Sequence, residues 1–97
     1  MQALSVATGS VGESTEGKLV RITGTITQPI FDDSPFGFII VLNDGSGEVN
    51  SFVCASTGID VSGLHQGQII KVTGFSGQFA DHFEVDPRFQ DDIQVEN

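Results

Sequence analysis

The sequence has few positive charges. Its 97 residues include 4 Lys and Arg against 13 Asp and Glu, which gives a formal net charge of −9. A polybasic nucleic-acid binder needs many cations to neutralise phosphates, so this class is disfavoured. No apolar run approaches 18 residues, so we expect no membrane span. No basic, apolar leader is visible. A mature domain cut from a longer secreted chain would look the same, which leaves cytoplasmic and extracellular locations open.

Cysteine and the larger aromatic residues are also scarce. The single cysteine, Cys54, excludes an internal disulfide. It stands in an apolar run without an activating base nearby, so we expect a buried, unreactive thiol. Trp and Tyr are absent. These are the side chains that commonly form sugar-stacking platforms, so carbohydrate binding ranks third among the ligand classes.

Catalytic and metal-binding motifs are absent as well. The chain contains no GxSxG, HExxH, P-loop or CxxC pattern. His65 and His82 are far apart in the sequence, which argues against a zinc site. The turn at residues 44–48 lacks the alternating acidic ligands of a calcium loop. We therefore expect a binding module without enzymatic activity, cofactor or metal.

The residues that are present favour strands. Short runs rich in β-branched residues and Phe alternate with Gly-, Ser- and Asp-rich breaks, which predicts one small all-β domain. The expected strands are residues 18–28, 36–43, 48–54, 68–74 and 82–86, with Pro87 as a stop and a short final strand around Ile93 and Val95. Asp44-Gly45 predicts a hairpin between the second and third strands. Between the third and fourth strands we expect a loop with one short helical turn.

An internal echo links two of these strands. EGKLVRITG at residues 16–24 recurs as QGQIIKVTG at residues 66–74, in the same register. Each copy enters after a Gly, alternates through an apolar stripe and reaches a second Gly, Gly24 or Gly74, where we expect a bend. Two equivalent, sharply coiled strands among five suit a small closed Greek-key barrel.

Four motifs together carry a resemblance to a known family. They are EGKLVRITGTI (16–26), FIIVLNDGSGEV (38–49), STGIDVSGLHQGQIIKVTGF (56–75) and PRFQDDIQV (87–95). They resemble bacterial OB-fold (oligonucleotide/oligosaccharide-binding) domains that accompany extracellular nucleases and phosphoesterases. In outline they are also similar to the single-strand-binding modules of replication protein A. The resemblance implies a five-stranded Greek-key OB barrel at residues 16–97, preceded by a lead-in at residues 1–15.

The resemblance also implies a location for the ligand. OB-folds bind on the second and third strands, beside two loops, which here are residues 29–35 and 75–81. Arg21 and Lys71 hold matching outward positions on the first and fourth strands. Phe38 and Phe83 are expected in the core. The residues expected at the nucleic-acid site are Arg21, Phe31, Phe36, Ile39, Val41, Asn50, Phe52, Lys71 and Phe79.

Two functional hypotheses follow. In the first, the module binds single-stranded nucleic acid by stacking bases on phenylalanines, with Arg21 and Lys71 as the few cationic contacts. The acidic residues Asp32, Asp33 and Asp81 in the two loops oppose this hypothesis. In the second, the domain is an acidic accessory or protein-interaction domain without nucleic-acid affinity of its own, and it packs against a catalytic neighbour through Ile39, Val41 and Phe52. An apolar patch without a basic rim supports the second hypothesis, and a basic groove counts against it.

Overall fold

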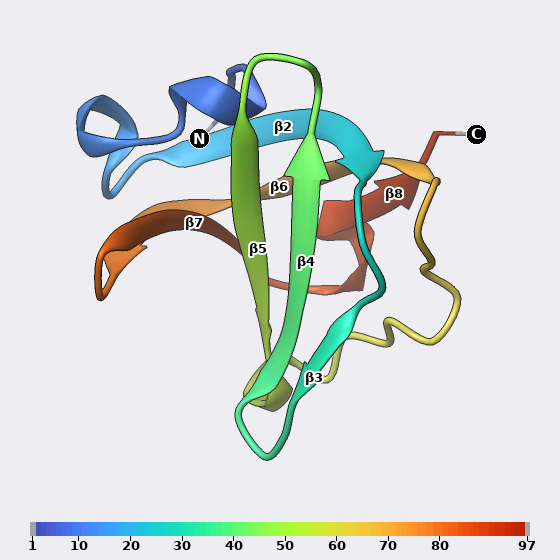
Figure 1. The fold of residues 1–97 in the computed structure, drawn as a ribbon. Helices are drawn as coiled ribbons and strands as arrows, with labels where there is room; N and C mark the ends of the chain where they lie inside the picture. The colour runs from blue at the N-terminus through green and yellow to red at the C-terminus, as the bar shows by residue number, and fades with distance from the viewer. Residues whose placement is uncertain (1, 97) are drawn as a thin grey trace.

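Runs of alternating apolar residues form five long strands in the computed structural model, which describes residues 2–96 (Figure 1). The long strands are β2 (Leu19–Ile26), β4 (Gly37–Asn43), β5 (Glu48–Cys54), β6 (Ile69–Phe79) and β7 (His82–Pro87). Three short strands are β1 (Leu4–Ser5), β3 (Phe31–Asp33) and β8 (Ile93–Val95). Single 3₁₀ turns lie at Thr8–Ser10, Glu13–Thr15, Ala55–Thr57 and Gln90–Asp92. The turn at Ala55–Thr57 is the short helical turn expected between the third and fourth main strands.

The long strands close into a barrel. Their order is β2–β4–β5–β7–β6, and β6 pairs back onto β2. All neighbours are antiparallel except β5 and β7, which run parallel. Numbered as main strands only, the ring reads 1-2-3-5-4-1. The predicted five-stranded Greek-key barrel is therefore confirmed.

The core fills the inside of this ring. Its fully buried side chains come from every long strand, and they include Ile22, Ile40, Val53, Val72 and Val85. Full burial of each such side chain contributes about 1.5–3 kcal/mol.

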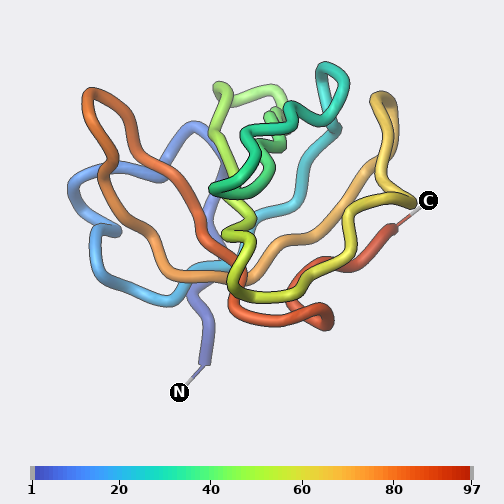
Figure 2. The backbone as a smooth tube through the Cα atoms, turned by 90° about the horizontal axis from the view of Figure 1, so that it is seen from below, coloured from blue at the N-terminus to red at the C-terminus, as the bar shows by residue number. Residues whose placement is uncertain are grey.

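The segment between β5 and β6 completes the core. Ile59 and Val61 from this segment are buried with the strand residues. In Figure 2 the segment is yellow and crosses the near side of the barrel. Phe38 packs against the core as expected, whereas Phe83 is only half-buried and lies outside the core cluster.

The two echoing segments pair with each other. β2 and β6 run antiparallel, and Val20 lies opposite Gly74 while Gly24 lies opposite Ile70. At each glycine the strand meets a third strand: a Cβ on Gly24 would lie 3.2 Å from the Asn43 backbone of β4, and one on Gly74 would collide with the Asp86 carbonyl oxygen of β7. The predicted bends are therefore the places where β2 turns onto β4 and β6 turns onto β7.

Two expected loops and the expected burial of Cys54 were wrong. Residues 29–35 contain β3, which pairs with the start of β4. Most of residues 75–81 continues β6 as far as Phe79, and a tight turn at Ala80-Asp81 leads into β7. Cys54 is half-exposed because it alternates outward on β5, opposite Gly37.

The segment before residue 16 packs on the barrel. β1 pairs in parallel with β2, and Thr8 is buried against the β4–β5 hairpin. The Thr8 hydroxyl donates to the Asp44 carboxylate at 3.0 Å, and the Thr8 backbone N–H donates to the same carboxylate at 3.1 Å. Asp44 also accepts hydrogen bonds from the Ser46 side chain and backbone, which hold the pKa of its carboxyl well below the usual range. These hydrogen bonds therefore hold the N-terminal segment against the β4–β5 hairpin.

Candidate binding faces

The outward side of β3, β4, β5 and β7, hereafter the front face, carries a row of apolar side chains. Phe31 pairs with Ile39, and Ile39 pairs with Phe52, so these three lie side by side across three strands. Phe31 is 56% exposed, and Ile39 and Phe52 are half-buried. The hairpin predicted between these two strands is thus confirmed, and its register brings Ile39 and Phe52 of the predicted site together beside Phe31.

The other predicted front-face residues differ in access. Asn50 is half-buried and lies between Val41 and Glu84. Val41 is only 7% exposed, so it offers a ligand little surface, contrary to expectation. Phe36 and Phe79 are both 66% exposed. They lie at the ends of two hairpins, beside the turns that join β3 to β4 and β6 to β7, and not within the row.

Two carboxyl groups on β7 complete the front face. Glu84 lies beside Asn50, and Asp86 follows two residues later on the same side of the strand. Burial raises the pKa of Asp86 to about 7, and the neighbouring charge of Glu84 adds to this effect. The Asp86 Oδ1 atom is buried without a hydrogen-bond partner. His82 lies at the hairpin end of β7, with its Nε2 3.6 Å from a Glu84 oxygen.

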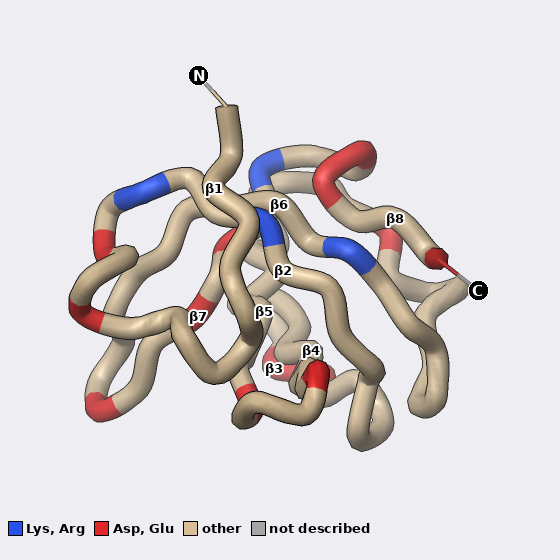
Figure 3. The backbone as a smooth tube through the Cα atoms, turned by 90° about the horizontal axis from the view of Figure 1, so that it is seen from above, with Lys and Arg blue, Asp and Glu red and all other residues tan. Residues whose placement is uncertain are grey.

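Most of the cations gather on the opposite side of the barrel. Arg21 of β2 pairs with Thr73 of β6, and Lys71 of β6 pairs with Thr23 of β2. We call this outward surface of β2 and β6, with the adjoining Arg88, the back face. Figure 3 shows the Lys and Arg segments on this side, in the same half of the view, with acidic segments around them. Arg21, Lys71 and Arg88 are scattered along the sequence, yet they line a single hollow together with Asp91 and Asp92.

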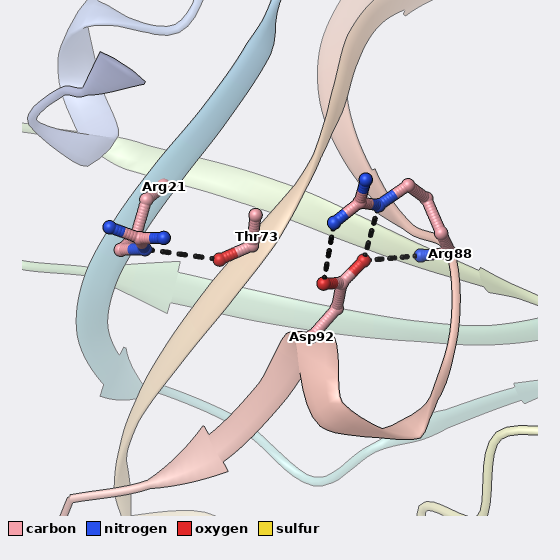
Figure 4. Close-up of polar contacts among 4 residues, drawn as sticks. All are labelled: Arg21, Thr73, Arg88 and Asp92. Carbon is pink, nitrogen blue, oxygen red and sulfur yellow. Dashed lines mark hydrogen bonds and ion pairs between the residues drawn. The ribbon is translucent and has the colours of Figure 1, made fainter. Parts of the chain in front are cut away.

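The three cations differ in their partners. Lys71 Nζ lies 3.5 Å from a Glu96 oxygen. Arg88 donates from Nε at 2.8 Å and from Nη2 at 3.0 Å to the two oxygens of Asp92. Burial alone would raise the pKa of Asp92, but the hydrogen bonds from Arg88 outweigh it and hold that pKa below its usual value. Among residues 2–96, the Arg21 guanidinium donates from Nε alone, to the Thr73 hydroxyl at 3.2 Å (Figure 4).

The front and back faces therefore differ in charge. β5 is two strands away from both β2 and β6 around the ring, so the front and back faces point in opposite directions. In Figure 1, β4 and β5 lie in front of β2 and β6. The predicted site residues Arg21 and Lys71 are thus not brought together with Phe31, Ile39 and Phe52. A ligand on the front face meets carboxylates instead of cations.

The sequence prediction omitted three residues that shape these faces. Alternation with the buried Val85 places Glu84 and Asp86 outside the barrel, and this signal was available in the strand pattern. Arg88 is distant in sequence from Arg21, so no local pattern places the two together. Among residues 2–96 there is no group of three or more His, Cys, Asp or Glu side chains arranged to hold a metal. Within the same residues, no helix is long and apolar enough to cross a membrane.

Comparisons with known proteins support the architecture. No family model and no curated protein matches the chain. The OB domain (residues 67–166) of MM0293 from Methanosarcina mazei is similar, with a TM-score of 0.74 and 15% identity over 99% of this chain and 84% of that one. The hypothetical protein ygiW from E. coli is also similar, with a TM-score of 0.61 and 18% identity over 98% and 90% of the two chains. Neither similarity tests the accessory role beside nucleases and phosphoesterases, which stays a prediction. The ring of strands and these two structural neighbours together establish that this chain has the OB fold.

Proposed function

We propose that this chain is a non-catalytic binding module whose front face binds a polypeptide segment with apolar and cationic side chains. The observation that carries the proposal is the row Phe31–Ile39–Phe52, which is apolar, accessible and bordered by acids, whereas Arg21 and Lys71 lie on the opposite side of the barrel. The sequence alone ranked single-stranded nucleic acid first. Because Arg21 and Lys71 lie on the other side of the barrel, we rank a polypeptide ligand above nucleic acid for the front face.

The chemistry of the face supports a partner of this kind. Exposed aromatic and aliphatic side chains at the centre of a surface favour protein partners. Asp33 lies on the same side of β3 as Phe31 and borders the row at one end, and Glu84 and Asp86 border it at the other. Carboxylates at the rim select Lys and Arg in the partner and speed its association at low salt. The net charge of −9 acts in the same direction.

A peptide titration tests this proposal. The probe is a fluorescent peptide that alternates Lys with Leu, and its anisotropy is followed as the 97-residue chain is added. We expect Phe31→Ser to weaken binding by about fivefold, because loss of an exposed aromatic anchor typically costs about 1 kcal/mol. The matched control is Phe89→Ser. Phe89 is 51% exposed, similar to Phe31, but it lies next to the back face.

Two results would contradict the proposal. One is equal weakening by Phe31→Ser and Phe89→Ser, because binding would then follow exposed phenylalanine in general. The other is equal binding of a peptide in which Glu replaces Lys, because the acidic rim would then select nothing. Raised salt should weaken the interaction, since the rim charges are exposed to solvent.

Single-stranded nucleic acid is the second candidate. The exposure of Phe31, Phe36 and Phe79 favours it, because such rings can stack on bases at about 1–3 kcal/mol each. The carboxylates of the front face oppose it. Anisotropy of labelled oligo-dT at low salt separates the candidates. Binding that is lost in Phe31→Ser supports nucleic acid on this face, whereas no binding at high micromolar protein rejects it.

A further inference from the structure

We propose that the hollow between Arg21 and Arg88 on the back face is a binding site for a phosphate group. This inference is independent of the ligand on the front face, because the two surfaces point in opposite directions and share no residue. It rests on three properties of the hollow: its charge, its unused hydrogen-bond donors and its second guanidinium.

The charge of the hollow is opposite to that of the chain. It is lined by Gln2, Ala3, Leu19, Arg21, Thr73 and Arg88, and it encloses ≈ 370 Å³. The lining contains two guanidinium groups, in a chain of net charge −9. The adjoining hollow shares Arg21, Thr73 and Arg88 and is lined by Asp91 and Asp92 as well. Each water occupies about 30 Å³, so the space admits a phosphate with part of its hydration shell. Asp92 pairs with Arg88 at 2.8 Å and offsets its charge, so Arg21, which has no carboxylate partner among residues 2–96, supplies the unpaired positive charge of the hollow.

Arg21 is held in place with donors to spare. Its Nε donates to the Thr73 hydroxyl at 3.2 Å, directly across the β2–β6 pair. No ion pair joins Arg21 to any carboxylate among residues 2–96, and its terminal nitrogens form no hydrogen bond there. A guanidinium that is fixed at Nε presents its remaining N–H groups as a preformed fork, which suits phosphate oxygens.

Arg88 supplies the second guanidinium. Asp92 occupies its Nε and Nη2, and these hydrogen bonds fix the side chain at the border of the hollow. Nη1 forms no hydrogen bond to the described part of the chain. Figure 4 shows Thr73 between the two arginines. Two guanidinium groups, one from β2 and one from the segment after β7, suit a tetrahedral oxyanion better than a planar carboxylate, which a single fork already satisfies.

Nuclear magnetic resonance of the 97-residue chain tests the site. Inorganic phosphate is added at constant pH, with sodium chloride adjusted to keep ionic strength constant. We expect saturable shifts of the Arg21 Nε–H and of the Thr73 and Arg88 amides. Arg21→Gln should weaken phosphate binding about tenfold, because a charge-assisted bidentate contact is lost. Arg21→Lys should fall in between, since it keeps the charge but loses the fork.

Lys18→Gln is the matched control. Lys18 is an exposed cation just before β2, and it does not line this hollow. The site is rejected if Lys18→Gln weakens phosphate binding as much as Arg21→Gln, or if chloride alone produces the same shifts. Thermal melts of each variant verify folding.

A second titration identifies the source of the phosphate. Oligo-dT that binds more tightly than inorganic phosphate, with the same loss in Arg21→Gln, supports the site and assigns it to a nucleic-acid backbone. Phosphate binding without oligo-dT binding supports the site and assigns it to a small phosphorylated compound. Phe31→Ser should leave both titrations unchanged, so failure of this site and failure of the proposed function can be distinguished.

Discussion

Glu84 and Asp86 lie on the same side of β7, two residues apart, and the pKa of Asp86 is raised to about 7 by burial and by the charge of Glu84. The unfolded chain ionises this carboxyl near 3.8, whereas the folded chain keeps its proton until about pH 7. Across this window the unfolded state loses a proton that the folded state retains. The free energy of unfolding should therefore fall as the pH rises from about 4 to about 7.

Thermal melts between pH 4 and pH 8 measure this dependence. The melting temperature should fall as the pH rises through that window, and Asp86→Asn should flatten the profile. Asp91→Asn, which changes an exposed acid, should keep the slope. The lowered pKa values of Asp44 and Asp92 stabilise the fold above the unfolded pKa of 3.8, and this contribution is lost only as the pH falls below that value and those carboxylates become protonated. An Asp86→Asn profile as steep as that of the parent would contradict the assignment.

Gly74→Ala should destabilise the barrel by about 1–3 kcal/mol, because the added methyl group would collide with the Asp86 carbonyl oxygen where β6 meets β7. Gly77→Ala is the matched control. It lies on the same strand, and no atom lies within 4 Å of the place that its methyl group would take. Urea unfolding should show a clear loss for the first variant and little change for the second. Equal midpoints would mean that the close approach at Gly74 is not a constraint.

Thr8→Val should destabilise the fold by about 1–3 kcal/mol, because it removes a buried hydroxyl that bonds the β4–β5 hairpin. The lost partners are the Asp44 carboxylate at 3.0 Å and the Gly47 carbonyl at 2.5 Å. Thr23→Val repeats the chemistry at an exposed position and should have little effect. Hydrogen exchange provides a local measurement: protection should fall at Ser46 and Gly47 in the Thr8 variant first. Unchanged protection there would show that the N-terminal segment does not hold the hairpin.

Ala80→Gly should stabilise the fold by about 0.5 kcal/mol. Ala80 has a φ of 56° in the two-residue turn between β6 and β7, a conformation that glycine adopts without steric cost. Ala55→Gly, in a 3₁₀ turn without positive φ, should instead lose a similar amount through backbone entropy. Chemical denaturation of the two variants compares the effects directly. A loss of stability in Ala80→Gly would contradict the turn geometry.

The barrel could be predicted because its strands alternate strongly and its bends fall at glycines. Ile22, Ile40 and Val72 each stand in such a pattern, and the echo of residues 16–24 in residues 66–74 correctly marked two equivalent strands. The extension of β6 could not be predicted. Ser76 and Gly77 are typical of loops, and the turn at Ala80-Asp81 lacks the glycine that usually marks a hairpin. Pairing with β7 overrides these local preferences.

The candidate site was predictable only in part. The β4–β5 register follows from the short Asp-Gly hairpin, so the sequence was sufficient to predict that Ile39 and Phe52 are neighbours. The clustering of Arg21 with Arg88 could not be predicted, because it depends on how the connection after β7 passes beside β6. The sequence gives the number of acidic and basic residues, but a ligand contacts only those on one face of the barrel. Which residues share a face depends on the fold.

The strands at the ends of the sheet have a consequence for self-association. β1, β3 and β8 contain two or three residues each, and they lie beside β2, β4 and β6. A long, flat edge strand would offer another copy a row of free N–H and C=O groups, which is how many β proteins begin to aggregate. These strands are too short to serve as such a template. The short edge strands therefore remove one route to self-association, the pairing of strand edges between copies of the chain.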